Sequence, residues 1–327
     1  MIKNNFGMKA AVFDEYGPPE VLHLTELDKP TPKENGVVVK VKATTVSPID
    51  LHCRSGNPFL ARLFARGVFK PRLKILGFDL AGDIESTGRN VKGLKKGNPV
   101  YGFIPMGESG ANAEFVSIPE KNLMIKPDLL SYEEAAAVPT AASIALWFLK
   151  QGGIEKAQKI LINGASGGLG TFAVQIAKSY GIKVTAVCST VNIEMMRYLG
   201  ADEIIDYTKK DFTVTENKFD IIFDAAGKTT FADCRTSLTL NGRYVSTAVT
   251  SQSILDMLIT SIIGKKKAIS KIAKPGVEDF NFINNLVMGM KIKPVIDKIF
   301  PFEKIVDAHR YAEKGHAKGK VIVKLID

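Results

Sequence analysis

The clearest pattern of apolar positions lies between Lys159 and Gly181. The apolar run 160–162 is typical of a buried strand and leads into a glycine-rich turn. Beyond Gly170 the apolar spacing becomes helical, and Gly181 is placed to end that helix. This stretch therefore predicts a strand, a tight turn and a helix.

The turn has the spacing of the dinucleotide fingerprint GxGxxG, with Ala165 in place of the first glycine. Gly167 would let a pyrophosphate approach the backbone, and Gly170 would let the helix pack closely on the strand. The free N–H groups at the start of the helix would face the phosphate charge. An ordinary glycine-rich turn is the alternative, and the flanking strand and helix argue against it. The turn residues expected to contact a cofactor are Ser166, Gly167, Gly168, Leu169 and Gly170.

Strands and helical segments continue to alternate as far as Thr247. Four more short strands are expected at residues 183–188, 203–206, 219–224 and 243–247. Such alternation implies right-handed crossovers and a parallel sheet with helices on both faces. Ligands bind outside the carboxyl ends of the strands in such sheets. The further expected cofactor contacts are therefore Ser189, Thr190, Ala225, Ala226, Gly227, Ser246 and Thr247.

Before and after this segment the chain has the pattern of short strands punctuated by glycine and proline. A capping box formed by Ser131 and Glu134 begins a helical segment soon after Pro127. The last strand, 320–325, could not easily extend the parallel sheet and is expected to rejoin the first strands. We therefore expect a β-rich domain of residues 1–127 and 277–327, with a Rossmann-type domain of residues 128–276 inserted into it.

Composition and charge narrow the class of protein. The chain has 327 residues, enough for two domains, and a formal net charge of +10. The basic residues are spread out and do not interleave with aromatic residues, which favours a basic surface that attracts anionic cofactors over one that binds nucleic acid. Three scattered cysteines without a CxxC motif disfavour disulfides and a zinc cluster, and they fit a reducing cytoplasm.

The sequence shows no signal for membrane insertion. The N-terminus lacks a long apolar segment, so no signal peptide is expected. The most apolar window, 254–263, is too short to span a bilayer and predicts a buried helix. Because three lysines follow it, attachment to a membrane surface is a minor alternative.

Several motifs together resemble the medium-chain dehydrogenase/reductase superfamily, and within it the zinc-free quinone oxidoreductase-like branch. They run in order over nearly the whole chain and include MKAAVFDEYGPPEVL, VSPIDLHCRSG, GFDLAGDIESTG, VPTAASIALWFL, INGASGGLGTFAVQIAK and KPVIDKIFPFEKIVDAHRYAEKGHAKGKVIV. The resemblance implies an α/β fold, in which a Rossmann-type doubly wound parallel sheet is inserted into a β-rich, partly open GroES-like barrel. It also implies an active site between the two domains and a homodimer that pairs its cofactor sheets through segment 267–273.

Three positions depart from the zinc-dependent alcohol dehydrogenases. Where those enzymes carry a catalytic cysteine, a His-Glu pair and a third ligand, this sequence has Ser47, Phe78 with Asp79, and Thr140. A catalytic zinc needs about three protein ligands, so we expect no zinc, and no flavin either. Oxidation of simple alcohols is difficult without a Lewis acid. Reduction of a quinone or an α,β-unsaturated carbonyl requires less, because the nicotinamide supplies the hydride and the protein stabilises the oxygen.

The resemblance places Ser47 and His52 at the substrate mouth, and these two residues with Thr140 are the candidate catalytic residues. His52 could donate a proton near neutral pH, and a surface histidine is the equal alternative. Thr140 would contact the nicotinamide carboxamide or else cap a helix. Asp50 and Arg54, four residues apart, are expected to form a structural ion pair.

The segment 57–74 is both apolar and basic and lies between two of the family motifs. It is expected to form either a substrate lid or a surface helix.

The end of the second strand of the expected Rossmann-type sheet favours NADPH over NADH. An NAD enzyme would place an acid about twenty residues beyond the glycine turn, where this strand instead ends in Ser189 and Thr190. Their small hydroxyls tolerate a 2′-phosphate, which Tyr207 flanks in the resembling enzymes. No basic residue follows Thr190 directly, so Arg197 or Lys183 would have to supply the longer-range charge.

The sequence therefore predicts a cytoplasmic, homodimeric, zinc-independent oxidoreductase that transfers hydride from NADPH to a quinone or an α,β-unsaturated carbonyl. A metal-free carbonyl/alcohol oxidoreductase is one alternative, and it would turn over aldehydes or alcohols instead. An NADPH-binding protein with a salt-dependent RNA-binding role is the other, which the basic charge permits. The intact glycine turn and the polar mouth argue against a purely structural role.

Overall fold

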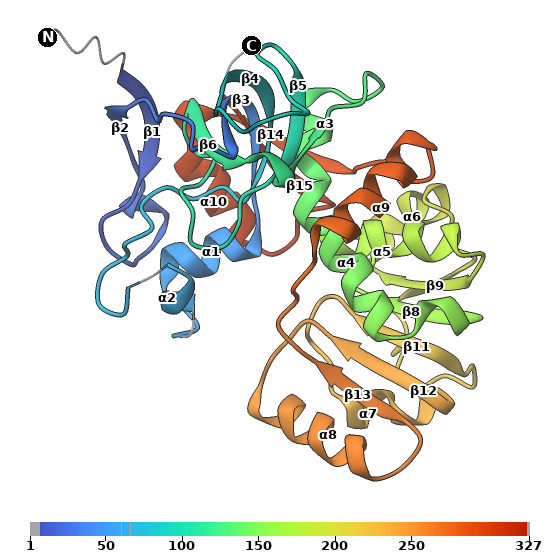
Figure 1. Cartoon of the computed structure of the whole chain (residues 1–327). Helices are drawn as coiled ribbons and strands as arrows, with labels where there is room; N and C mark the ends of the chain where they lie inside the picture. The colour runs from blue at the N-terminus through green and yellow to red at the C-terminus, as the bar shows by residue number, and fades with distance from the viewer. Residues whose placement is uncertain (1–6, 60, 66, 326–327) are drawn as a thin grey trace, which may run out of the picture. The chain divides into compact units, whose positions relative to one another are not determined.

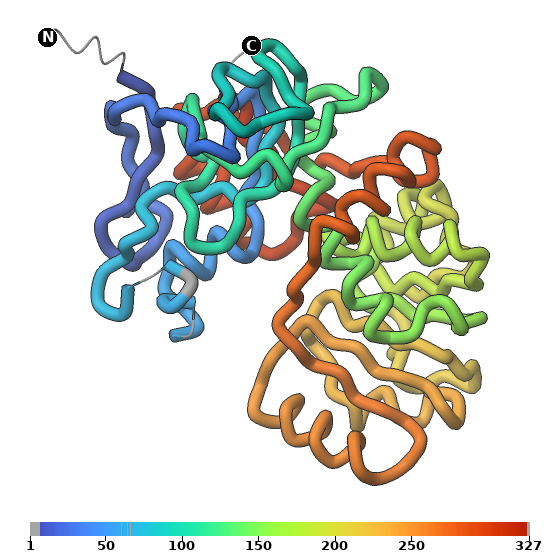
Figure 2. The backbone as a smooth tube through the Cα atoms, viewed as in Figure 1, coloured from blue at the N-terminus to red at the C-terminus, as the bar shows by residue number. Residues whose placement is uncertain are grey.

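The computed structural model describes residues 7–59, 61–65 and 67–325, and the chain divides into two compact units (Figure 1). The terminal unit comprises Met1–Thr140 and Pro294–Asp327, and the inserted unit comprises Ala141–Lys293. Figure 2 traces how the C-terminal segment, in red, returns to the unit that the N-terminal residues, in blue, begin. No helix among the described residues combines the length and the apolar character needed to cross a membrane.

The unit boundaries lie further along the chain than the expected ones at 127 and 276. Helix α3 (Tyr132–Ala137) packs on strands β3 and β4 of the terminal unit. Helix α9 (Val277–Met288) belongs to the inserted unit, where Gln175 exchanges two hydrogen bonds, of 2.8 and 3.0 Å, with the backbone of Lys293. A capping box and a helical period predict that a helix forms, but they do not say which core it packs against.

The terminal unit is built on a seven-stranded sheet of order β14-β15-β3-β4-β5-β7, in which β6 pairs with β3. A separate two-stranded sheet joins β1 and β2. The strands are β1 Gly7–Val12, β2 His23–Asp28, β3 Gly36–Val46, β4 Asp79–Thr87, β5 Pro99–Phe103, β6 Phe115–Pro119, β7 Leu123–Ile125, β14 Ile296–Pro301 and β15 Lys320–Lys324. The helices are α1 Pro48–Ser55, α2 Ala61–Phe64, α3 and α10 Ile305–Glu313. As expected, the last strand rejoins the first part of the chain, because β15 pairs antiparallel with β3.

Strand β3 forms the centre of the terminal core. Its valines Val37, Val39 and Val41 are fully buried and pack with Leu80 and Ile84 of β4. Each of these side chains contributes about 1.5–3 kcal/mol when removed from water. Packing in this core thus fixes the positions of the ends of β3 and β4. The polar residues at those ends are positioned in the same way.

The inserted unit is a six-stranded parallel sheet of order β10-β9-β8-β11-β12-β13. Its strands are β8 Lys159–Asn163, β9 Lys183–Cys188, β10 Glu203–Asp206, β11 Phe219–Asp224, β12 Leu238–Ser246 and β13 Lys267–Ser270. Its helices are α5 Gly168–Ser179, α6 Ile193–Tyr198, α7 Phe231–Cys234, α8 Ser251–Ile262 and α9, and the chain enters it through α4 (Pro139–Gln151). The strand order reverses between β8 and β11, which is where such sheets bind ligands. This confirms the predicted α/β fold.

A buried carboxylate joins distant parts of the terminal unit. Asp79, the first residue of β4, is fully buried. Its Oδ1 accepts a hydrogen bond from the backbone N–H of Thr140 (2.7 Å). Its Oδ2 accepts from the Thr45 hydroxyl (2.8 Å) and pairs with Lys320 Nζ (3.1 Å). The pair links the C-terminal strand to β4 and to the start of α4.

Replacing Lys320 with methionine should lower the free energy of unfolding by about 3–5 kcal/mol, because Asp79 would keep an uncompensated charge in the interior. The double variant Asp79→Asn/Lys320→Met should lose less, because it buries no unpaired charge. Denaturant unfolding followed by circular dichroism measures both. A loss below about 1 kcal/mol for Lys320→Met would show that the pair does not stabilise the terminal unit.

Candidate functional site

The glycine-rich turn follows β8 and begins α5, as expected. Gly164 has φ of 74°, a left-handed conformation that favours glycine. A Cβ on Gly170 would lie 2.2 Å from the carbonyl oxygen of Gly164, so a side chain there would push the helix off the strand. A Cβ on Gly167 would meet nothing closer than 3.5 Å. The turn therefore packs closely where Gly170 meets Gly164, and it leaves open space at Gly167 beside the helix N-terminus. This combination fits a pyrophosphate.

The carboxylate of Asp224, the last residue of β11, organises the neighbouring loop. It is fully buried, and it accepts hydrogen bonds from Asn163 Nδ2 (2.9 Å), the N–H of Gly227 (3.0 Å) and the N–H of Thr229 (2.8 Å). Its backbone carbonyl accepts from the N–H of Thr247 (3.2 Å). These bonds fix the expected cofactor residues 225–227 and Thr247 at one edge of the sheet. The sequence analysis did not single out Asp224, although an acid that ends an apolar strand could have indicated it.

The end of β9 carries an acidic neighbour that the sequence analysis did not expect. The Thr190 hydroxyl donates a hydrogen bond to Asp206 Oδ2, and Thr208 donates to Oδ1 from its N–H (3.0 Å) and its hydroxyl (2.7 Å). The bond from Thr190, followed by those from Thr208, holds the pKa of Asp206 below its ordinary value. Ser189 accepts from Asn192 Nδ2 (3.2 Å), and Tyr207 is exposed. Asp206 lies beside Thr190 because parallel pairing sets this residue of β10 opposite the end of β9, although no acid follows β9 directly in the sequence.

The two basic residues expected to face a 2′-phosphate are engaged elsewhere. Arg197 pairs with Glu194, and Lys183 Nζ lies 2.6 Å from Glu203 Oε1. The cation beside Asp206 is instead Lys209, whose Nζ lies 3.8 Å from Oδ2.

In the terminal unit, Ser47 caps helix α1 and contacts a buried acid. Asp50 is fully buried; its Oδ2 accepts from the N–H of Ser47 (2.8 Å) and from the Ser47 hydroxyl (2.6 Å). Its Oδ1 accepts from the N–H of Gly77 (2.8 Å). Burial raises the pKa of Asp50 to about 6. Asp50 thereby ties the start of α1 to the residues that precede β4.

The prediction of an ion pair between Asp50 and Arg54 was wrong. Arg54 is buried and instead pairs with Glu313, donates to the carbonyl oxygen of Gly17 and lies 3.3 Å from His309 Nδ1. The four-residue spacing suits a helical ion pair, but Asp50 stands in the first turn, where its carboxylate caps the helix.

His52 and Thr140 occupy different surroundings. His52 is exposed on α1, and its Nδ1 donates to the carbonyl oxygen of Asn57 (2.8 Å). Its Nε2 is therefore the atom available for proton exchange. Thr140 lies in the first turn of α4, where its N–H is bonded to Asp79. Asp50 and Asp79 thus bring Ser47 and Thr140 to the end of β3 and the start of β4, and His52 is held by a separate contact.

The donor set at these positions does not fit a catalytic zinc, which needs about three protein ligands. The Ser47 hydroxyl is bonded to Asp50, and the carboxylate of Asp79 is satisfied by Lys320, Thr45 and Thr140. Over residues 7–59, 61–65 and 67–325, no group of three or more His, Cys, Asp or Glu side chains is arranged to hold a metal. The cysteines are free and buried, and burial raises the pKa of Cys188 to about 11.

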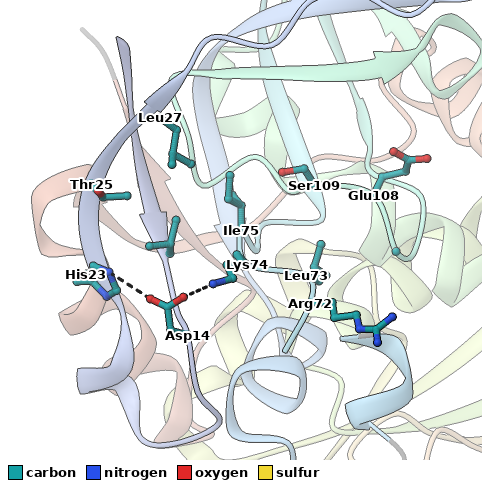
Figure 3. Close-up of a pocket in the computed structure, with 12 residues that line it drawn as sticks. Asp14, His23, Thr25, Leu27, Arg72, Leu73, Lys74, Ile75, Glu108 and Ser109 are labelled. Atoms are coloured by element: carbon teal, nitrogen blue, oxygen red, sulfur yellow. Dashed lines mark hydrogen bonds and ion pairs between the residues drawn. The ribbon is translucent and has the colours of Figure 1, made fainter. Parts of the chain in front are cut away.

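One hollow, of about 660 Å³, lies in the terminal unit; Arg72, Leu73 and Lys74 of segment 57–74 help to line it, and none of the expected cofactor or catalytic residues does. Figure 3 shows Asp14 in this hollow between His23 and Lys74, with the His23 Nε2 to Asp14 distance at 3.7 Å. A smaller hollow of about 200 Å³ in the inserted unit is lined in part by two of the expected cofactor residues, Gly227 and Ser246. The smaller hollow therefore contains two expected cofactor contacts and none of the candidate catalytic residues.

Segment 57–74 contains the single short helix α2, and its residues Leu60 and Arg66 lie outside the described residues. Whether it forms a lid over a substrate stays a prediction.

Comparison with known proteins identifies the family of the chain. The family "Alcohol dehydrogenase GroES-like domain" matches residues 33–128, and the family "Zinc-binding dehydrogenase" matches residues 199–323. The 2-methylene-furan-3-one reductase of Solanum lycopersicum is 33% identical over 97% of this chain and 79% of its own length. The chloroplast envelope quinone oxidoreductase homolog of Arabidopsis thaliana is 33% identical over 97% of this chain and 98% of its own.

The same relationship holds in three dimensions. The structure of the quinone oxidoreductase from Coxiella burnetii superimposes with a TM-score of 0.87 at 29% identity, covering 98% of this chain and all of that one. With 98% of this chain covered, the match includes residues of both units. The chain therefore belongs to the quinone oxidoreductase-like branch of the medium-chain dehydrogenase/reductase superfamily.

Proposed function

We propose that this protein is an NADPH-dependent oxidoreductase that reduces a quinone or an α,β-unsaturated carbonyl without a metal. One observation carries the proposal: a glycine-rich turn with the spacing of the dinucleotide fingerprint stands at the switch point of the inserted sheet, while Ser47, Phe78 and Thr140 stand where the zinc-dependent enzymes carry metal ligands. The relatives named as quinone oxidoreductase and 2-methylene-furan-3-one reductase support the substrate class. Zinc independence is part of the proposal, although one matching family is named for zinc.

Each group of cofactor residues has a role in this proposal. Residues 166–170 and the N-terminus of α5 would hold the pyrophosphate, and residues 225–227 with 246–247 would line the nicotinamide half. Ser189, Thr190 and Tyr207 would contact the adenosine ribose and its phosphate. The bound cofactor supplies a hydride to the electrophilic carbon. The chain itself must then orient the substrate and stabilise the negative charge that grows on its oxygen.

In the terminal unit, we assign that second task to Ser47, His52 and Thr140. Above about pH 6 the Asp50 carboxylate is ionised and takes the hydrogen bond of the Ser47 hydroxyl. Ser47 is therefore oriented by Asp50 and presents a lone pair, whereas the Nε2 of His52 takes no part in the contact with Asn57. His52 is thus the better candidate for proton donation.

Three further points belong to the proposal. Strand β13 is the last strand of the inserted sheet, and its segment 267–273 would pair with that of a second copy to form a homodimer. Three buried free thiols suit a reducing compartment such as the cytoplasm. The spread of basic residues, without interleaved aromatic residues, supports a small-molecule substrate over RNA.

The proposal is tested by the oxidation of NADPH and NADH after treatment with a chelator, with 1,4-benzoquinone and an enone as parallel acceptors. We expect turnover that prefers NADPH and is unchanged by the chelator. Tight binding of NADPH without turnover of either acceptor would contradict the proposed substrate class. Turnover of aldehydes alone would favour the metal-free carbonyl reductase.

Asp206→Asn should raise the preference for NADPH over NADH about fivefold, because it removes a negative charge beside Thr190, worth about 1 kcal/mol against a 2′-phosphate. The measurement is the ratio of kcat/KM for the two cofactors. Asp211→Asn is the matched control, since Asp211 accepts from the N–H and hydroxyl of Thr213 in the same way that Asp206 accepts from Thr208. An unchanged ratio in Asp206→Asn would place the 2′-phosphate elsewhere.

His52→Gln should lower kcat/KM for an enone by about 10²–10⁴, the usual contribution of a positioned acid. His23→Gln changes another exposed histidine of the terminal unit and should leave the rate unchanged. Equal rates for wild type and His52→Gln would make His52 a surface residue, the alternative raised by the sequence.

A further inference from the structure

Helix α8 of the inserted unit is turned so that its polar side faces the protein. The Ser253 hydroxyl lies 3.0 Å from the Ser270 hydroxyl of β13, and the buried Thr260 hydroxyl accepts from the N–H of Ala268 (2.9 Å). A helix on the surface of a globular domain ordinarily buries its apolar side. Helix α8 does the opposite, so the prediction of a buried helix at 254–263 was wrong.

The apolar side of α8 is left in solvent. We call it the α8 stripe; its members are Ile254, Leu255, Leu258, Ile259, Ile262 and Ile263. Residues 254, 258 and 262 are spaced by four, as are 255 and 259, so the two rows lie side by side along one face, and Ile263 follows directly as the C-cap. Leu258 is 56% exposed, Ile263 69% and Ile262 84%. Figure 1 shows α8, in orange, as a separate helix next to the edge strand β13.

Positive charge gathers at the C-terminal end of the α8 stripe. Lys265, Lys266 and Lys267 follow the helix directly. Lys267 Nζ donates to the last carbonyl oxygens of α8, including that of Ser261 (3.2 Å), and Lys266 Nζ donates to the carbonyl oxygen of Arg235 (2.7 Å). Partial burial, and then the nearby charges of Lys218 and Arg235, lower the pKa of Lys266. Lys266 therefore lies near two further cations, Lys218 and Arg235.

No acid of α8 balances these cations. The one acidic residue of the helix, Asp256, accepts from Gln252 Nε2 (2.8 Å) and lines the hollow on the inner side. A two-fold contact between copies sets the same residues on both sides. The α8 face of a second copy would offer these lysines only more lysines and neutral side chains. The face instead complements a partner that is apolar and negatively charged together.

We propose that the α8 stripe and the adjacent Lys265 and Lys266 form a docking surface for an anionic lipid bilayer. The helix would lie in the plane of the interface, with its apolar stripe among the acyl chains and its lysines among anionic headgroups. This surface is separate from the cofactor residues. The proposal depends on the exposed apolar side of α8 and on the charge of the lysines that follow the helix. It would hold an enzyme that reduces apolar electrophiles at the surface where such molecules concentrate.

The test is sedimentation of the full-length protein with vesicles of phosphatidylcholine alone, or with phosphatidylglycerol as one third of the lipid. We expect binding to the anionic vesicles that weakens at high ionic strength. Leu258→Gln/Ile262→Gln should reduce that binding by at least about tenfold, because two apolar side chains no longer enter the bilayer. Lys265→Ser should reduce it about fivefold. Leu129→Gln/Val214→Gln replaces two exposed apolar residues elsewhere and should bind like the wild type.

Two readouts keep the result unambiguous. NADPH oxidation by each variant shows that it is folded, and light scattering gives its oligomeric state. Wild-type protein that stays in solution with anionic vesicles would overturn the proposal, as would equal binding by Leu258→Gln/Ile262→Gln. A change from dimer to monomer in that variant, without vesicle binding by the wild type, would assign the α8 stripe to a second copy.

Discussion

The carboxylate of Asp79 is the contact on which the arrangement of the terminal unit depends. It is fully buried and joins the end of β3, the start of α4 and Lys320, a residue 241 positions further along the chain. A buried ion pair has a large desolvation cost, so it holds only when its remaining hydrogen-bond positions are also filled. Here Thr45 and Thr140 fill them. The position of Thr140, a candidate for substrate contact, therefore follows from a contact made by the C-terminal strand.

Two other buried acids, Asp50 and Asp224, also join separate segments of the chain through hydrogen bonds. Asp50 links Ser47 to the N–H of Gly77, and Asp224 links Asn163 to the loop after β11. Each is surrounded by N–H and hydroxyl donors instead of cations, which is a sufficient way to satisfy a buried carboxylate. In this chain, carboxylates position the loops and the cofactor supplies the reactive group. Under the proposed function, that division would let the fold transfer hydride with no metal ligands at Ser47, Phe78 and Thr140.

The sequence was sufficient for features set by local pattern. The parallel strands, the glycine turn and the return of the last strand to the first were predicted correctly, because each depends on apolar periodicity or on the steric needs of glycine. The acid beside Thr190 was missed because only the register of β9 and β10 places Asp206 there. Arg54 was assigned to the wrong partner because its acid, Glu313, is distant in sequence.

The orientation of α8 shows a further limit of sequence patterns. Its apolar residues recur at helical spacing, and that period predicts a helix correctly. The same period does not say which side faces the protein. Ser253 and Thr260 decide this, because their hydroxyls are bonded to residues 268 and 270 near and within β13. Only tertiary contacts could therefore reveal that the apolar side is exposed.

Hydride transfer to a carbon conjugated with a carbonyl group, by protein freed of metal, is the central claim of this account. Its most direct test is the transfer of deuterium from NADPH labelled at the nicotinamide C4, with methyl vinyl ketone as acceptor and NMR of the product. The account predicts one deuterium on the β-carbon of the saturated ketone and an intact carbonyl group. Deuterium on the carbonyl carbon of an alcohol product, or transfer that requires added zinc, would contradict it.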